Sequence, residues 1–240
     1  MAKILVENIN VSNMAQALKG MRNPLESWRD SDSTVICCDL SGTDGENPKV
    51  LSVPLCEFNQ TELLPVIGFV LGEADKALAL RLIRAGSDHS KFMRQIGFIA
   101  DITAPMTWWW DFDTYKVSTT KNSTSRMHKL GARSLTREDF GWETADDASE
   151  KLRGAIISDL NGRIEKWKEL KGVSPEEAKL LWRSIIDDLP QSYMFKATWS
   201  GNYQILRNIW FSRKGHKQVE FDMFRKVIES LPYSQLITCE

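Results

Sequence analysis

A short polar stretch in the middle of the chain combines hydroxyl groups with a cation. Thr124, Ser125 and Arg126 are consecutive, and Lys116 precedes them. The oxygens of a phosphate monoester accept hydrogen bonds from hydroxyls and backbone amides, and they pair with a guanidinium group, which stays charged and donates in a fixed fork. The stretch therefore offers the groups that would bind an anion such as a phosphate. Lys116 is either a further partner of that anion or a solvated lysine.

Three consecutive tryptophans, Trp108, Trp109 and Trp110, come before this stretch. Successive helix residues point in three directions, so at most one or two of these rings can face a common ligand, and the others are expected in the core or in a subunit interface. The alternative is that the rings give a flat surface on which another ring system stacks. The polar run 118–125 also has two interpretations, a plain flexible loop or part of the phosphate site.

The composition argues against several classes of function. Lys and Arg number 31 against 32 Asp and Glu, so the net charge of -1 gives no general attraction to a nucleic acid polymer or an anionic membrane. The three His are scattered, the four Cys are too few for a disulfide framework, and we expect no metal site. Glycine-rich phosphate loops and a nucleophile elbow are absent from the sequence. Without a long apolar run or a signal-peptide pattern, we expect a soluble cytoplasmic protein.

The periodicity of apolar residues predicts alternating strands and helices around these segments. In the first half, Gly86 is the expected stop of a helix whose stripe is Leu71, Ala74, Leu78, Leu82 and Ala85. The expected elements are a strand over 3–8, a helix over 14–21, strands over 35–40 and 50–55 joined as a hairpin through 41–49, the helix over 71–85, a strand over 96–102 that ends at Ala104-Pro105, and a short helix over 107–115.

The second half reads as mostly helical. Pro175 at a first helical position, followed by two acids, is a start signal, and Asn202 is the expected N-cap of the helix that follows it. The expected elements are helices over 144–171 and 175–188, a strand over 193–199, a turn at Gly201-Asn202, a helix over 203–213 that Gly215 breaks, and a helix over 218–231.

Two segments, 88–127 and 189–220, resemble the flavin-dependent thymidylate synthases. The signature of that family is Arg-His-Arg followed by a Ser, and later by a Ser and an Arg, after a strand and a short helix. In this sequence the order is a turn at His89-Ser90-Lys91, a strand up to Ile102, the Ala104-Pro105 stop and a helix up to Phe112. In this alignment, the Arg-His-Arg triplet corresponds to Thr114-Tyr115-Lys116 and the following Ser to Thr119. The later Ser corresponds to Thr124, and the Arg that accompanies it corresponds to Arg126.

The resemblance continues toward the C-terminus. Asn202, Leu206, Asn208 and Arg213 match the Asn-to-Arg helix of the family, and His216–Glu220 (HKQVE) resembles its His-Ala-Gln-Trp-Glu run. The segment MRNPLESW, 21–28, lies where the family has an early flavin-contacting segment.

The resemblance implies a fold, an activity and partners. The fold would be α+β, an antiparallel sheet flanked by helices, in a single domain over 1–240 with a divergent part at 1–85 and family-like segments at 86–130 and 189–220. The activity would be reductive one-carbon transfer to C5 of dUMP, with FAD, and with NADPH and methylenetetrahydrofolate as co-substrates. The family builds its flavin sites between the subunits of a homotetramer, so one chain alone would be an incomplete site.

The resemblance also implies roles for individual residues. Arg213 would be catalytic and would stabilise negative charge on the pyrimidine ring, although it could also be a surface arginine, and His89 could simply cap a turn. The substrate-binding residues would be Thr124, Ser125, Arg126, Lys116 and Asp111. The cofactor-binding residues would be His89, Lys91, Thr114, Tyr115, Thr119, Asn202, Asn208 and His216.

The triplet Thr114-Tyr115-Lys116 departs from the family pattern, because it keeps one cation of two and replaces the imidazole by a phenol. A lost charge-assisted contact costs about 1.5–3 kcal/mol, which would weaken flavin binding. Two alternatives therefore stay open. One is a nucleotide-binding relative without flavin catalysis, which senses or sequesters a nucleotide. The other is the same scaffold with an altered pyrimidine substrate.

Overall fold

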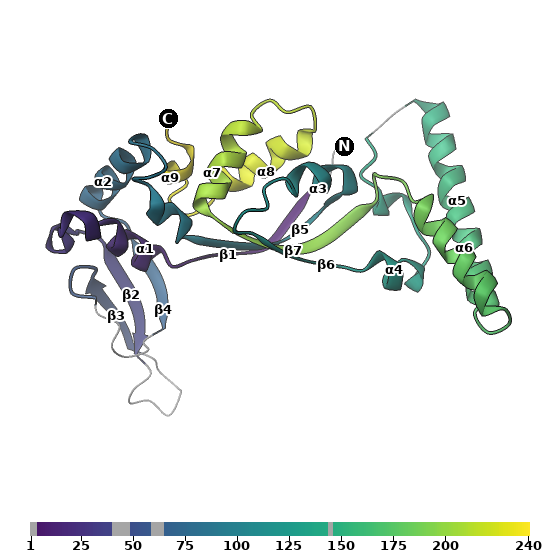
Figure 1. The fold of residues 1–240 in the computed structure, drawn as a ribbon, viewed down its shortest axis with the longest axis horizontal. Coiled ribbons are helices and arrows are strands. Elements are labelled where there is room, and N and C mark those ends of the chain that lie inside the picture. Colours follow the sequence, from purple (N-terminus) through teal and green to yellow (C-terminus); the bar gives the residue numbers. More distant parts are fainter. Residues whose placement is uncertain (1–3, 40–48, 59–64, 144–145) are drawn as a thin grey trace. The chain divides into compact units, whose positions relative to one another are not determined.

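The computed structural model describes residues 4–39, 49–58, 65–143 and 146–240 (Figure 1). The chain forms two compact units. Unit 1 comprises the described residues of Met1–Ile9, Ala100–Trp199 and Lys214–Phe224. Unit 2 comprises those of Asn10–Ile99, Ser200–Arg213 and Arg225–Glu240. The expected organisation as one domain stays a prediction.

A four-stranded sheet supplies the strands that carry several candidate residues. Its strand order is β1-β5-β7-β6. In β5, Phe98, Ala100 and Ile102 are buried while Ile99 is 42% exposed, which confirms the alternation predicted for this strand. The strands are β1 (Leu5–Ser12), β5 (Gly97–Pro105), β6 (Thr120–Ser123) and β7 (Met194–Asn202).

A three-stranded antiparallel sheet belongs to unit 2 (Figure 1). Strand β2 (Thr34–Asp39) pairs with β3 (Lys49–Pro54) in the register Val35↔Val53, so the expected hairpin is confirmed, while most of its turn lies outside the described residues. On its other side, β2 pairs with β4 (Val66–Val70), with an irregularity between Ile36 and Cys37. Strand β4 is thus at one edge of this sheet.

The helices of unit 2 include α1, whose predicted bounds are confirmed, and α7, which ends one residue earlier than predicted. Asn202 was expected in a turn, but it is the last residue of β7. The helices are α1 (Met14–Met21), α2 (Glu73–Arg84), α7 (Tyr203–Ser212) and α9 (Gln235–Thr238), with short 3-10 turns η1 (Asn23–Leu25), η2 (Trp28–Asp30) and η3 (Lys91–Arg94).

The stripe predicted for α2 was right at Leu78, which is buried, and wrong at its two alanines. Ala74 and Ala85 are exposed, and the buried face consists of Asp75, Leu78, Ala79 and Ile83. The reason is that the carboxylate of Asp75 is buried against the guanidinium group of Arg22. The periodicity of apolar residues cannot predict the burial of such a charged pair.

Unit 1 contains a long helical hairpin. Helices α5 (Asp147–Leu170) and α6 (Pro175–Asp187) lie side by side (Figure 1). The start of α5 is capped by Asp146, whose side chain accepts a hydrogen bond from the backbone of Ser149, while the expected start at Thr144 lies outside the described residues. The other elements are α3 (Met106–Phe112), α4 (Arg126–Lys129), η4 (Leu130–Ala132), η5 (Arg137–Asp139) and α8 (Val219–Glu229), which begins in unit 1.

The three tryptophans of α3 differ in burial, as expected for successive helix residues that point in different directions. Trp108 is fully buried and stacks on Phe112 with ring centres 4.3 Å apart. Trp109 is buried as well, and its indole N–H donates to the backbone oxygen of Phe195 at 2.9 Å. Trp110, in contrast, is 55% exposed. Helix α3 is shorter than predicted and ends at Phe112, and the polar run that follows is not a plain loop because it contains β6.

The part of the chain that the structure describes contains no helix long and apolar enough to cross a membrane. The same residues contain no group of three or more His, Cys, Asp and Glu side chains arranged to hold a metal ion.

Candidate functional site

Arg126, in unit 1, lines two hollows of the surface. It is the first residue of α4 and is half-buried, with Nη1 3.1 Å from the Sδ atom of Met106 and the guanidinium 6.0 Å from the ring centre of Phe195. A hollow of about 310 Å³ opens beside it. The residues that line this hollow are Ser123, Thr124, Ser125, Arg126, Met127, Ile186 and Phe195.

The structure brings the predicted phosphate residues together, but one of them, Thr124, uses its hydrogen-bond donors within the protein. The backbone N–H and the hydroxyl of Thr124 both donate to the backbone oxygen of Lys196, at 3.0 and 3.1 Å. These bonds tie the end of β6 to β7, so the donors of Thr124 are occupied. Ser125 is exposed beside Arg126, and its side chain makes no capping hydrogen bond. Ser125 and Arg126 are therefore the donors best placed for an anion.

A second hollow, of about 170 Å³, shares Arg126 and Phe195 with the first. Lys121 lines it, with Nζ 5.0 Å from the ring centre of Trp109 and in an ion pair with Asp113. The exposed Trp110 also lines it. Sequence reasoning missed Lys121, because it treated this run as loop or phosphate segment. Recognising β6 would have placed Lys121 and Ser123 on one face of a strand.

The segment that stands on the family triplet forms a compact turn. The hydroxyl of Thr114 donates to the backbone oxygen of Asp111 at 2.7 Å, and that of Thr119 donates to the oxygen of Tyr115 at 3.1 Å. Ser118 has φ +59°, in the left-handed region. The hydroxyl protons of both threonines thus close the turn itself, whereas the side chain of Lys116 is exposed.

Asp111 and His216, which are far apart in sequence, lie together in unit 1. The Oδ2 atom of Asp111 is 3.9 Å from Nε2 of His216 and accepts a hydrogen bond from Nε2 of Gln218 at 3.1 Å. The backbone N–H of Gln218 donates to Nδ1 of His216 at 3.2 Å. Because Nδ1 accepts, a neutral His216 carries its proton on Nε2, toward the carboxylate.

Glu220, two residues further on, is only 9% exposed. Burial raises the pKa of its carboxyl group, and the nearby negative charge of Glu143 raises it further. This side chain was not singled out from the sequence, since a single Glu at the start of a helix gives no signal of burial.

The remaining predicted residues belong to unit 2. His89 and Lys91 are both exposed at the turn between α2 and η3, where the backbone N–H of His89 donates to the oxygen of Gly86. Gly86 has φ +109°, which the turn requires and which favours glycine. The two side chains therefore point from one tight turn into solvent.

Three of the predicted residues lie within α7 or at its two ends. Asn202 is buried and its Oδ1 accepts from the backbone N–H of Ile205 at 3.1 Å, so the predicted N-cap is confirmed. Asn208 is exposed and accepts from Nε2 of Gln204 at 3.1 Å. Arg213 is half-buried and is the C-cap residue, one position beyond the last helical residue.

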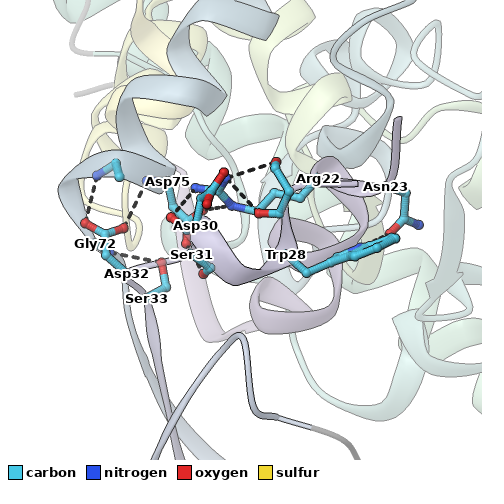
Figure 2. Close-up of polar contacts among 11 residues, drawn as sticks. Arg22, Asn23, Trp28, Asp30, Ser31, Asp32, Ser33, Gly72 and Asp75 are labelled. Atoms are coloured by element: carbon cyan, nitrogen blue, oxygen red, sulfur yellow. Dashed lines mark hydrogen bonds and ion pairs between the residues drawn. The ribbon is translucent and has the colours of Figure 1, made fainter. Parts of the chain in front are cut away.

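The segment 21–28 is organised by a buried arginine. Arg22 is 4% exposed, and its Nε lies 2.5 Å from Oδ1 of Asp75. Figure 2 shows the two side chains facing each other. The other nitrogens of Arg22 donate to the backbone oxygens of Ser27 and Asp30, at 3.2 and 3.0 Å. The second oxygen of Asp75 accepts from the hydroxyl of Ser31 at 2.6 Å. Arg22 thus holds both ends of the segment to α2.

The next residues fix the start of α2 (Figure 2). The carboxylate of Asp32 accepts from the backbone N–H groups of Ala74 and Asp75, at 2.8 and 3.0 Å. Burial opposes ionisation here, but these hydrogen bonds outweigh it and the pKa of Asp32 is lowered. A Cβ atom on Gly72 would lie 2.1 Å from Oδ1 of Asp32, so this close approach needs glycine.

Comparison with known proteins gives a structural match only. No family model matches the sequence, and no curated protein is similar to it at a significant level. Two solved structures of thymidylate synthase X, a flavin-dependent thymidylate synthase from Helicobacter pylori, do match, and both contain FAD and dUMP. One is 15% identical with a TM-score of 0.60 and covers 98% of this chain and 95% of that chain. The other is 17% identical with a TM-score of 0.59 and covers 96% and 95%.

The chain has the fold of a flavin-dependent thymidylate synthase. The predicted α+β class, with antiparallel pairing in the sheet of unit 2, is confirmed. The match extends over nearly the whole chain, including the first 85 residues, in which the sequence resemblance is loose. At this identity the match shows the thymidylate synthase fold, and the assigned roles of individual residues stay predictions.

Proposed function

We propose that the chain is a thymidylate synthase-like enzyme that binds dUMP and transfers a reduced one-carbon unit to C5 of its base. The proposal includes methylenetetrahydrofolate as the carbon donor, NADPH as the reductant, a cytoplasmic location and a homotetramer. The observation that carries it is the hollow at Arg126, which lies on the scaffold of proteins whose structures contain FAD and dUMP.

The charges around Arg126 suit a nucleoside monophosphate. Arg126 and Lys121 line adjoining hollows, and the charge of Lys121 is partly balanced by Asp113. The phosphate would take the guanidinium of Arg126, of which Nη1 also contacts Sδ of Met106, and the hydroxyl of Ser125. The exposed ring of Trp110 borders the same surface and gives an apolar contact for a sugar or a base.

Chemistry of this kind needs no protein nucleophile. The chain would contribute by holding the pyrimidine in place and by stabilising negative charge on its ring, and a guanidinium suits the second task because it is always protonated. Arg213 is the residue we propose for this role. The pair of Asp111 and His216 would hold its imidazole proton on the nitrogen that faces the carboxylate.

Part of the predicted cofactor set fits a flavin dinucleotide. His89 and Lys91 present a ring N–H and an ammonium group from one exposed turn, and these donors suit the diphosphate of FAD. When bound, the flavin would supply the redox chemistry of the reaction. Asn208 is exposed on α7 of the same unit and could contact the cofactor as well.

A second candidate function is nucleotide binding without flavin catalysis. It is favoured by one observation, namely that the hydroxyl protons of Thr114 and Thr119 are donated to the backbone of their own turn. Such a protein would keep the phosphate site at Arg126 and would sense or sequester the nucleotide.

Two measurements on the purified protein separate these functions. The enzyme should take up added FAD, show a flavin absorption band, and lose that band when NADPH is added under anaerobic conditions. Titration calorimetry with dUMP should give binding in both cases. Protein that binds dUMP but takes up no FAD supports the second function. Protein that binds neither ligand contradicts both.

A further inference from the structure

A cavity in unit 2, remote in sequence from every predicted nucleotide residue, has the dimensions of a ligand site. It measures about 750 Å³, and small-molecule sites commonly measure roughly 300–1,000 Å³. Three segments line it, which are 10–16 at the end of β1 and the start of α1, 65–69 in and before β4, and 232–233.

Its apolar walls are held rigidly. The hydroxyl of Tyr233 donates to the backbone oxygen of Phe69 at 2.8 Å and accepts from the backbone N–H of Leu71 at 3.0 Å. The rings of Phe69 and Tyr233 meet edge to face, with centres 6.1 Å apart. Both residues line the cavity, together with the side chains of Met14 and Ile67. Two aromatic rings therefore stand in one corner with their orientations fixed.

Two lining residues have unusual backbone conformations. Tyr233 has φ +53°, in the left-handed region that bulky residues rarely occupy because of steric cost, whereas Asn13, with φ +63°, is of a residue type that enters this region more readily. Strain of this kind persists where the surrounding structure imposes it, and it concentrates at ligand sites. Asn13 stands at the N-cap position of α1, yet its side chain makes no capping hydrogen bond. Its amide is thus available to the cavity.

The polar groups of the cavity are uncharged. Among the described residues that line it, the polar side chains are those of Asn10, Ser12, Asn13, Gln16 and Tyr233, and none is Asp, Glu, Lys, Arg or His. A charged ligand would lose its hydration without gaining a partner of opposite charge. Carboxamides each offer a donor and an acceptor, which match a ring N–H beside a carbonyl.

We propose that this cavity is a second binding site, which takes an uncharged planar heterocycle with an amide edge. The base of a nucleoside and a free pterin ring share this chemistry. The heterocycle would lie against the rings of Phe69 and Tyr233, with its amide edge toward Asn13 and its neighbours. This site is independent of the phosphate site at Arg126 and does not rest on the proposed function.

The test is titration calorimetry of the full chain with thymidine, with pterin and with cyclohexanol, which has one hydroxyl group but no planar ring and no amide edge. Binding of thymidine or pterin supports the site and identifies which source of the heterocycle it prefers. If neither binds at millimolar concentration, or if cyclohexanol binds equally well, the proposal is wrong.

Variants locate the binding. Ile67→Trp should fill the cavity and abolish heterocycle binding, whereas Val70→Trp is the matched control, since Val70 is an exposed residue of the same strand that does not line the cavity. Asn13→Gly removes the amide while glycine accepts the same left-handed backbone, and the loss of the hydrogen bonds of the amide should weaken binding by roughly tenfold. The unfolding temperature shows whether each variant is folded. If Ile67→Trp is not folded, Asn13→Gly decides.

The cavity variant also gives the result that would overturn the site. If folded Ile67→Trp binds the heterocycle as the unmodified chain does, the heterocycle occupies another site and the proposal fails.

Discussion

Arg126 is the residue on which the proposed nucleotide site depends most. Its guanidinium lies along Met106 and Phe195, beside a hollow that is open to solvent. We predict that Arg126→Ala weakens the binding of dUMP by about tenfold or more, since a charge-assisted hydrogen bond contributes about 1.5–3 kcal/mol. Binding of deoxyuridine, which has no phosphate, should change little. Titration calorimetry with both ligands measures the difference.

The matched control for this variant is Lys129→Ala. Lys129 is an exposed cation in the same helix that does not line the hollow. Its removal should leave both affinities unchanged. Equal losses for dUMP and deoxyuridine in Arg126→Ala would remove the phosphate assignment.

Glu220 gives a prediction about pH. Burial raises the pKa of this carboxyl group above its ordinary value of 4.5, so folding opposes its ionisation. The stabilisation of the protonated form is fully present below pH 4.5 and is lost as the pH rises through the raised pKa. Glu220→Gln should therefore increase the free energy of unfolding at neutral pH, and the gain should vanish in acid.

Urea unfolding over a series of pH values measures this effect. The exposed Glu169→Gln serves as the control and should show a much smaller dependence. A gain in Glu220→Gln that is constant over the whole pH range would show that the change acts through packing rather than through ionisation.

At the scale of elements, α7 depends on its cap. Asn202 accepts from the backbone N–H of Ile205, so Asn202→Ala leaves a helical donor without its partner. We predict a loss of about 1 kcal/mol in the free energy of unfolding. Asn208→Ala, at an exposed position within the same helix, should cost less, because alanine is the better helix former. Urea unfolding compares the two, and equal losses would contradict the cap.

The contact between α1 and α2 depends on a buried ion pair. Arg22 and Asp75 are both almost fully buried, and each carries further hydrogen bonds to the segment between them. Replacing one partner, as in Asp75→Leu, should cost about 3–5 kcal/mol because it leaves a buried charge without its counterion. The double variant Arg22→Leu/Asp75→Leu should lose less than the sum of the single changes, which urea unfolding of all three proteins would reveal. Additive losses would mean that the pair is not coupled.

At the scale of the whole molecule, the proposed enzyme is an assembly of four chains. The expected mass is therefore four times the 27.4 kDa of one chain, and sedimentation velocity measures it. A flavin site built between subunits should also lose FAD when the protein is diluted below the concentration at which it assembles. A stable monomer that retains FAD would contradict this part of the proposal.

Several features were predictable from the sequence because their causes are local. The bounds of α1, the cap at Asn202 and the alternation in β5 follow from apolar periodicity and from a side chain that reaches its own backbone. The order of the segments around Arg126 was likewise sufficient to indicate the fold, which the solved structures confirm over nearly the whole chain.

Other features were decided only by the tertiary structure. Lys121 lies over the ring of Trp109, Asp111 lies beside His216, and these contacts join residues that no local pattern connects. Because Asp75 is buried against Arg22, the buried face of α2 differs from the predicted apolar stripe. The burial of a side chain and its hydrogen-bond partners depend on which segments fold against it. The sequence alone could therefore indicate the candidate hydrogen-bond donors of the site, but not which of these donors bond to other parts of the protein.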